Sequence, residues 1–232
     1  MKKIGVALLL IVFSLNYSFA QKRDIVEYQQ NWDKQKIFWG YYLGLNMKSY
    51  KITYLTDTNT FIDVSPSVGF NVGLIGDYRL HKNINLRLEP GLSSNTKELA
   101  FTHIPGGSTD SIRSVNSTYL RIPLLLKLNT DRYNNIRPYI IGGVSYDYNF
   151  SSNEDNPDDN YDGEFRMKKS NFTYEMGLGI DIYMPYFIFS PSIRGVFAIN
   201  DELVRDNNTN SPWTGNVDYF GTRGIFLKLA FH

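Results

Sequence analysis

Hydrophobic and polar residues alternate with a period of two along most of the chain after residue 36. Eight stretches show this alternation: residues 37–48, 69–80, 84–92, 119–128, 137–148, 172–182, 187–197 and 225–231. Successive side chains of a β-strand point to opposite faces, so each stretch predicts a strand with one apolar and one polar face. No stretch of comparable length has the spacing of an amphipathic helix. The pattern therefore predicts an all-β protein.

The connections between these stretches alternate in length. Short turns are expected at residues 81–83, 130–135 and 184–185, and long polar loops at residues 51–66, 95–114, 151–168 and 200–215. An even number of antiparallel strands with short turns at one end and long loops at the other is typical of outer-membrane barrels. We therefore predict an eight-stranded antiparallel transmembrane β-barrel over residues 37–232. Its short turns and both termini would be periplasmic, and its long loops extracellular.

Alternation alone does not decide which face points inward, because a soluble lipocalin-like barrel would place the apolar face inside. The polar face is rich in glycine and carries charges of both signs, as the narrow bore of an eight-stranded barrel requires. Aromatic residues also gather near strand ends, as in interfacial girdles: Trp39, Tyr41, Tyr78, Tyr146, Tyr148, Tyr183, Tyr186 and Phe187. These features favour a membrane barrel with a polar network in its lumen, formed by Asp77, Arg79, Arg87, Glu89, Arg121, Lys127, Arg137, Asp147, Glu175, Asp181, Arg194 and Lys228.

One charge does not fit this scheme. Arg223 falls on the apolar phase of the last stretch, so we expect it near the outer rim of the barrel or after a bulge.

The first twenty residues have the layout of a secretory signal peptide. Lys2 and Lys3 precede an apolar run over residues 4–15, and small residues occupy positions 18 and 20. This order predicts cleavage after Ala20 and Sec-type export, whereas about a dozen apolar residues are too few for a membrane-spanning helix. Residues 1–20 are thus expected to be a signal peptide, and residues 21–36 a hydrophilic periplasmic lead-in to the barrel. The expected destination is the bacterial outer membrane.

Composition narrows the classes of function. The chain has 232 residues, a formal net charge of +1 and no cysteine. The absence of cysteine excludes disulfides, thiolate zinc sites and cysteine nucleophiles. A near-neutral charge without a basic excess argues against nucleic acid as a partner.

Candidate chemistry is sparse. The three histidines, His81, His103 and His232, have no carboxylate or serine neighbour at a spacing that suggests a triad. Asp158, Asn160 and Asp162 reproduce the opening of a calcium loop, but Lys169 occupies the position where that loop requires a bidentate glutamate. A solvated loop is therefore favoured over a metal site. We expect no enzyme activity, no cofactor and no small-molecule substrate.

Several motifs, taken in order, resemble one family. They are residues 39–46 (WGYYLGLN), 69–80 (GFNVGLIGDYRL), 85–92 (NLRLEPGL), 119–127 (YLRIPLLLK), 137–143 (RPYIIGG) and 177–181 (GLGID). This series resembles the PorT family, also called SprT, of Bacteroidetes outer-membrane proteins, over nearly all of the mature chain. His232 departs from the aromatic residue that usually ends such barrels.

The resemblance implies a role in type IX protein secretion and gliding motility. Side chains fill an eight-stranded bore, so the expected role is a non-enzymatic accessory that contacts other secretion proteins and outer-membrane lipid and does not conduct cargo. Two alternatives remain open. One is an OmpA-like structural or adhesion barrel with no secretion role, and the other is a membrane-embedded enzyme.

Overall fold

The structure, a computed structural model, describes residues 26–56, 62–101, 111–156, 165–208 and 211–232. It contains a short 3-10 helix, η2 (Trp32–Lys34), and ten antiparallel strands. The strands are β1 (Ile37–Tyr54), β2 (Ile62–Pro66), β3 (Val68–His81), β4 (Ile84–Leu88), β5 (Gly91–Phe101), β6 (Ile112–Asn129), β7 (Ile136–Asn149), β8 (Ser170–Tyr183), β9 (Ile188–Ala198) and β10 (Val217–Phe231). No helix in the described part of the chain is long and apolar enough to cross a bilayer.

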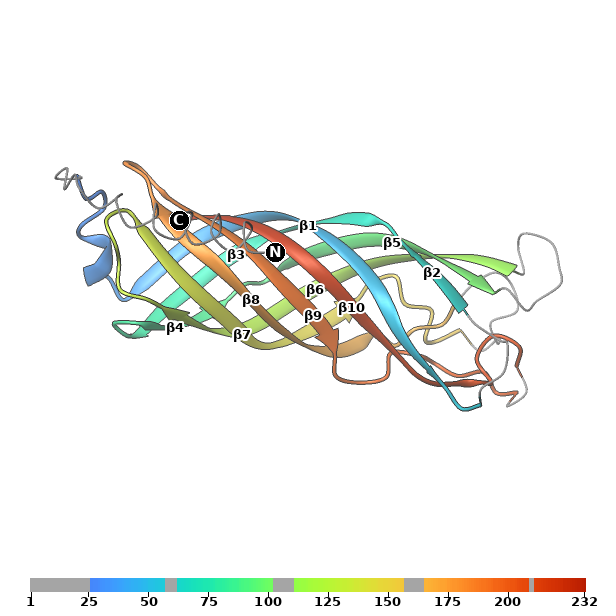
Figure 1. The fold of residues 1–232 in the computed structure, drawn as a ribbon. Helices are drawn as coiled ribbons and strands as arrows, with labels where there is room; N and C mark the ends of the chain where they lie inside the picture. Colours follow the sequence, from blue (N-terminus) through green and yellow to red (C-terminus); the bar gives the residue numbers. More distant parts are fainter. Residues whose placement is uncertain (1–25, 57–61, 102–110, 157–164, 209–210) are drawn as a thin grey trace, which may run out of the picture.

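The strands close into a barrel, because β1 pairs with β10 on one side and with β3 on the other (Figure 1). The pairing register on β6 continues from β4 to β5, with Leu88 facing Leu124 and Gly91 facing Arg121. Residues 89 and 90 therefore interrupt a single wall strand. Ser67 likewise separates β2 from β3, and the shift in register against β5 there marks a one-residue bulge. The predicted antiparallel barrel is confirmed. Two of its eight wall strands are each divided into two shorter strands, one into β2 and β3 and the other into β4 and β5.

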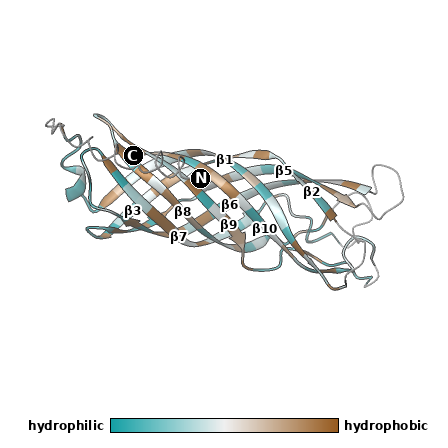
Figure 2. Ribbon diagram, viewed as in Figure 1, coloured by the Kyte–Doolittle hydropathy of each residue, from teal (hydrophilic) through white to brown (hydrophobic). Residues whose placement is uncertain are grey.

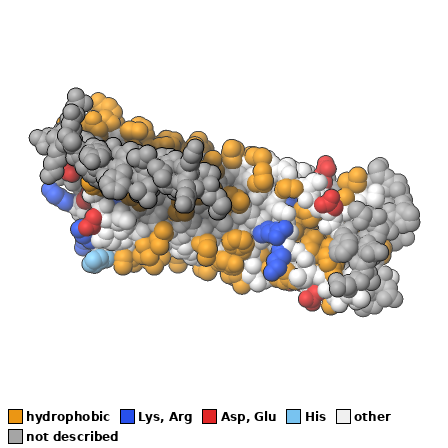
Figure 3. Space-filling view, viewed as in Figure 1, with side chains coloured by type: hydrophobic (Ala, Val, Ile, Leu, Met, Phe, Trp, Pro, Cys, Tyr) orange, Lys and Arg blue, Asp and Glu red, His pale blue; other side chains and the backbone are white. Residues whose placement is uncertain are grey.

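Apolar side chains cover the outside of the barrel wall. In β1 the outward residues Leu43, Leu45 and Met47 are each about half exposed, whereas the inward residues Asn46 and Lys48 are buried. Figure 2 shows the resulting alternation along the strands, and Figure 3 shows the hydrophobic surface that it produces. This arrangement suits a wall in contact with lipid.

The arrangement reverses toward the long-loop end. There the inward residues Tyr50, Leu99 and Phe220 are apolar and buried, while the outward residues Lys51 and Thr53 are exposed. The inward residues form a hydrophobic core that also includes Phe101, Val115, Phe165, Met167, Leu203 and Val217. The barrel beyond the apolar band is thus organised like a soluble protein, with an apolar interior and a polar exterior.

Strands extend into segments that the sequence pattern predicted to be loops. β1 continues to Tyr54, β5 to Phe101, and β6 begins at Ile112, so strands occupy parts of the predicted loops 51–66 and 95–114. In contrast, β7 ends, β8 begins and β9 ends close to the apolar band. The segments before β8 and after β9 meet at an isolated bridge between Met167 and Leu203, which covers the hydrophobic core.

Tight turns close the opposite end of the barrel. Between β6 and β7, Tyr133 and Ile136 exchange two backbone hydrogen bonds of 2.9 and 3.0 Å around Asn134 and Asn135. Asn134 has a φ of 54°, a left-handed conformation that asparagine tolerates well. His232 follows β10 at this same end, beside Ile188, so the C-terminal residue and the short turns share one rim.

Candidate functional site: the filled bore and its periplasmic cover

Ion pairs fill the bore within the apolar band. Of the twelve residues predicted for a lumen network, eleven are buried inside the barrel, and Arg79 lies at the short-turn rim. Five buried cations pair with five buried carboxylates in this band: Arg87, Arg121, Lys127, Arg194 and Lys228 face Asp77, Glu89, Asp147, Glu175 and Asp181. These pairs offset the cost of burying charge in a narrow interior. A sixth buried cation, Lys48, lies toward the loops with its ammonium 4.3 Å from the centroid of the Tyr119 ring.

Glu89 is the centre of this network. It lies at the interruption between β4 and β5, and Arg194 on β9 donates to both of its carboxylate oxygens at 2.7 and 2.8 Å. Lys228 on β10 donates to Glu89 at 2.8 Å, and Arg87 lies 3.6 Å away. One carboxylate therefore ties β9 and β10 across the bore to the wall formed by β4 and β5.

Two further groups of ion pairs extend the network along the bore. Arg121 bonds Asp147 at 3.1 Å and Glu175 at 3.3 Å on the side toward the loops. Toward the short turns, Lys127 lies 2.6 Å from Asp181, and Arg87 lies 2.6 Å from Asp77 (Nη2 to Oδ2). These contacts join side chains from separate strands, so the interior holds the wall together.

Two cavities among the described residues of the bore are each about large enough for a single water molecule. A cavity of about 20 Å³ lies among Asp77, Arg87, Lys127 and Asp181, and one of about 10 Å³ lies beside Lys48 and Arg121. A cavity needs a volume on the order of 10–15 Å³ to hold one water molecule. The bore is therefore a plug of side chains, and a folded protein cannot pass through it.

The lead-in residues cover the short-turn end of this plug. Asp33 pairs with Arg137 at 2.6 Å, with Arg79 at 3.5 Å and with Arg132 at 3.7 Å. Next to it, the Trp32 ring stacks on Phe38 with their centroids 4.7 Å apart. The sequence pattern did not identify Asp33, because the lead-in has no periodicity that would place it against the barrel.

Further contacts fix the lead-in to two turns. Asn135 accepts a hydrogen bond from the Tyr28 backbone and donates to the Val26 carbonyl, both at 2.9 Å. Gln29 donates to the carbonyl of Pro185 at 2.9 Å. Residues 26–36 are thus held to the turns before β7 and before β9.

The long-loop end carries buried charges that the sequence pattern also missed. Lys97 donates to the Tyr50 hydroxyl at 2.8 Å, and Glu202 accepts from Thr222 at 2.7 Å. Burial raises the pKa of the Glu202 carboxyl, while the Thr222 hydrogen bond opposes that shift. Lys97 and Glu202 fall in the predicted loops 95–114 and 200–215, so nothing in the pattern placed them inside.

Two individual expectations have clear outcomes. Arg223 is exposed on the outer surface near the outer rim, opposite Ser49 on β1, as predicted. Tyr183 was assigned to the interfacial girdle, and this is wrong. Its side chain is buried inside the short-turn end, with the Arg132 guanidinium 3.8 Å from its ring centroid.

The remaining candidate residues form no reactive cluster among the residues that the structure describes. His81 is exposed at the end of β3, whereas the His232 ring turns inward with Nε2 3.5 Å from Arg87. His103 and the possible metal ligands Asp158, Asn160 and Asp162 lie outside the described residues. Within the described ranges, no group of three or more histidine and carboxylate side chains could hold a metal ion.

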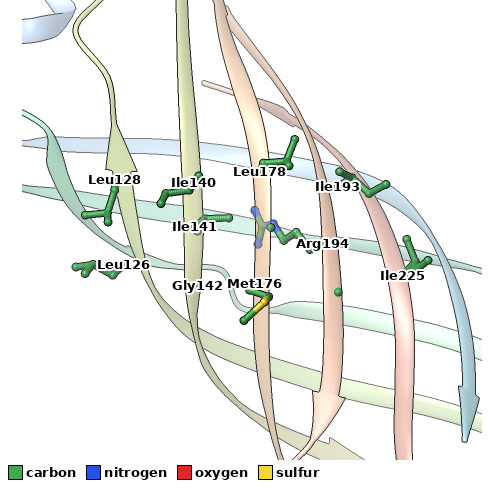
Figure 4. A pocket seen from close by; sticks show the side chains of 12 residues that line it. Leu126, Leu128, Ile140, Ile141, Gly142, Met176, Leu178, Ile193, Arg194 and Ile225 are labelled. Atoms are coloured by element: carbon green, nitrogen blue, oxygen red, sulfur yellow. The ribbon is translucent and has the colours of Figure 1, made fainter.

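A wider hollow lies on the lipid-facing wall (Figure 4). Its volume is about 700 Å³, and its sides are the aliphatic residues Leu126, Leu128, Ile140, Met176, Leu178, Ile193 and Ile225. Gly142 and Gly195 have no side chain, so the outer surface is recessed between these aliphatic residues. Acyl chains of the surrounding membrane match this lining.

A closed ring of antiparallel strands with an apolar outside and an ionic inside defines an outer-membrane β-barrel. The chain belongs to the outer membrane protein beta-barrel domain family, whose model matches residues 19–204. Its location is accordingly the bacterial outer membrane.

Solved outer-membrane barrels resemble the chain at low sequence identity. OprG of Pseudomonas aeruginosa is 12% identical with a TM-score of 0.48, covering 85% of this chain and 96% of its own. The attachment invasion locus protein Ail of Yersinia pestis, in complex with a heparin analogue, is 13% identical with a TM-score of 0.40, covering 85% and 97%. Neisserial surface protein A is 9% identical with a TM-score of 0.39, covering 82% and 95%. No curated protein matches the sequence.

Proposed function

We propose that this barrel acts by contact, as a non-enzymatic accessory of type IX protein secretion and gliding motility. The ordered series of motifs that resembles the PorT family supports the choice of pathway. The plugged bore supports the mode of action, because Arg194, Glu89 and Lys228 cross the interior where cargo would have to pass. An accessory with a closed bore must use its outer surfaces.

The periplasmic rim is the surface that we assign to this contact. Residues 26–36 are held there by Asp33 and Asn135, so the lead-in presents a fixed backbone next to the turns. Secretion components of the periplasm reach this rim without entering the membrane.

The test is deletion of residues 21–36, with the signal segment kept and barrel insertion verified by heat-modifiable gel mobility. Export of a type IX cargo into the medium and spreading on agar are the two readouts. We expect both to fall severalfold, whereas Thr53→Ser, at an exposed position of β1 toward the opposite, long-loop end, leaves them unchanged. Normal export in this deletion would remove the lead-in from the mechanism, and normal export without the whole protein would select the structural or adhesion barrel instead.

We also propose that residues 1–20 are a signal peptide removed after Ala20. Mass measurement of the protein from outer membranes tests this directly, since a mature chain beginning at Gln21 is expected.

A further inference from the structure

Two exposed cations lie side by side just beyond the apolar band. Arg223 on β10 faces Ser49 on β1, and Lys51 lies two residues further along β1, opposite Gly221. Both Arg223 and Lys51 point outward and are exposed. Diagonal neighbours on an antiparallel pair are about 7–8 Å apart, within reach of two long side chains converging on one group. We call Arg223 and Lys51 the cationic pair.

The level of the cationic pair coincides with the boundary of the membrane. Met47 and Ile225 are the last apolar outward residues below it on the two strands, and they face each other in the register. On β9, Phe197 lies in register with Arg223 and stacks on Tyr174, with ring centroids 5.2 Å apart. Aromatic side chains gather where a bilayer meets water, so the cationic pair lies at the depth of the lipid headgroups.

The cationic pair has no internal role that would explain it. Neither side chain makes an ion pair or a side-chain hydrogen bond with a residue that the structure describes, in contrast to the five bore cations that pair with carboxylates, Arg87, Arg121, Lys127, Arg194 and Lys228. Ser49 faces Arg223, and the Tyr219 ring lies over Gly221, which faces Lys51, so this part of the wall adds an aromatic side chain and no carboxylate beside the pair. Figure 3 shows a basic patch between the hydrophobic band and the loop end, in the region where Figure 1 shows β1 and β10 side by side.

We propose that the cationic pair binds the phosphate groups of a phosphorylated lipid of the outer leaflet. The long loops and the reversal of polarity place this end of the barrel outside the cell. A guanidinium offers two parallel hydrogen bonds to a phosphate, and an ammonium adds a compact charge. The acyl chains of the same lipid would descend along Met47 and Ile225. This inference is independent of the secretion role.

The experiment measures binding of bisphosphorylated lipid A to the full mature chain in maltoside micelles, by native mass spectrometry. Each cation near an anionic lipid surface contributes about 1 kcal/mol, so Arg223→Ser or Lys51→Ser should weaken binding about fivefold, and the double variant about thirtyfold. Arg223→Lys keeps the charge and should retain most of the affinity. The matched control is Lys36→Ser with Lys82→Ser, which removes two exposed cations at the opposite rim and should stay within about twofold of the wild type.

Two further probes separate the possible sources of phosphate. Lipid A stripped of its phosphates should bind as weakly to the wild type as intact lipid A binds to the double variant. Inorganic phosphate at millimolar concentration should not displace the intact lipid. Equal binding by the double variant and the wild type, equal binding of the stripped lipid, or full displacement by inorganic phosphate would each overturn the proposal. Circular dichroism and heat-modifiable mobility confirm that every variant is folded.

Discussion

Arg194 and Glu89 form a two-point ion pair across the bore, with nitrogen–oxygen distances of 2.7 and 2.8 Å. Both side chains are buried, and the pair links strand β9 to the residues between β4 and β5 on the other side of the bore. Glu89 has Lys228 and Arg87 as further partners, whereas Arg194 has only the more distant Glu175 at 3.4 Å among the described carboxylates. The two members of the pair are therefore not equivalent.

This asymmetry predicts that Glu89→Gln destabilises the barrel more than Arg194→Gln. Removing Glu89 leaves Lys228 and Arg194 without their shared carboxylate, and breaking a buried pair costs about 3–5 kcal/mol. Removing Arg194 leaves Glu89 with Lys228 at 2.8 Å, so about 1–3 kcal/mol is expected. Urea titration of the refolded protein in phospholipid vesicles measures the free energy of unfolding of both variants. The double variant should cost less than the sum of the two, and a larger effect of Arg194→Gln would contradict the assignment of Glu89 as the centre.

The period-two pattern predicted the barrel wall well because lipid and bore impose opposite demands on alternate positions. A residue such as Leu45 must face lipid, and its neighbour Asn46 must face the bore, so each strand carries its orientation in its sequence. The same rule explains Arg223. Its position in the alternation makes it point outward, and an outward positive charge is tolerated only beyond the part of the wall that contacts lipid.

The pattern could not predict what depends on contacts between distant segments. Tyr50 and Phe220 still point inward, as the alternation along their strands predicts, but near them the interior changes from ionic to apolar. The alternation of inward and outward positions continues unchanged through this region, so it does not reveal where the interior changes. Asp33 and Glu202 lie in segments without periodicity, and only the tertiary structure brings them to Arg137 and Thr222.

Asp33→Asn should loosen the lead-in and leave the barrel intact. The amide loses the charge that pairs with Arg79, Arg132 and Arg137, each at 3.7 Å or closer. Because Lys34 and Lys36 lie next to this contact, trypsin should cut there several times faster, while the heat-modifiable mobility of the barrel stays unchanged. Asp131→Asn, an exposed carboxylate on the same rim, is the control. Unchanged cleavage of the Asp33 variant would show that the other contacts of the lead-in suffice.

His232 makes stability depend on pH. Burial of its ring, together with the positive charges of Arg87 and Lys127, lowers the pKa of His232 to about 3. The unfolded chain binds this proton near pH 6.5, so between about pH 6.5 and 3 the unfolded state holds more protons and stability falls as the pH falls. From pH 7.5 to 5 the loss should be about 2 kcal/mol. His232→Gln should remove this part of the urea midpoint shift, whereas His81→Gln, at an exposed site, should retain it.

The contact of the outer wall with lipid can be tested at two positions on one face of one strand. Leu43 lies within the apolar band of β1 and Thr53 lies ten residues further along, and both point outward and are exposed. An arginine near the middle of the bilayer costs about 2–4 kcal/mol, whereas an exposed substitution in water stays within about 0.5 kcal/mol. Leu43→Arg should therefore slow insertion into vesicles and lower the urea midpoint, and Thr53→Arg should do neither. A soluble barrel would expose both positions to water and tolerate both arginines, so equal tolerance would mean that the apolar face of β1 does not contact lipid.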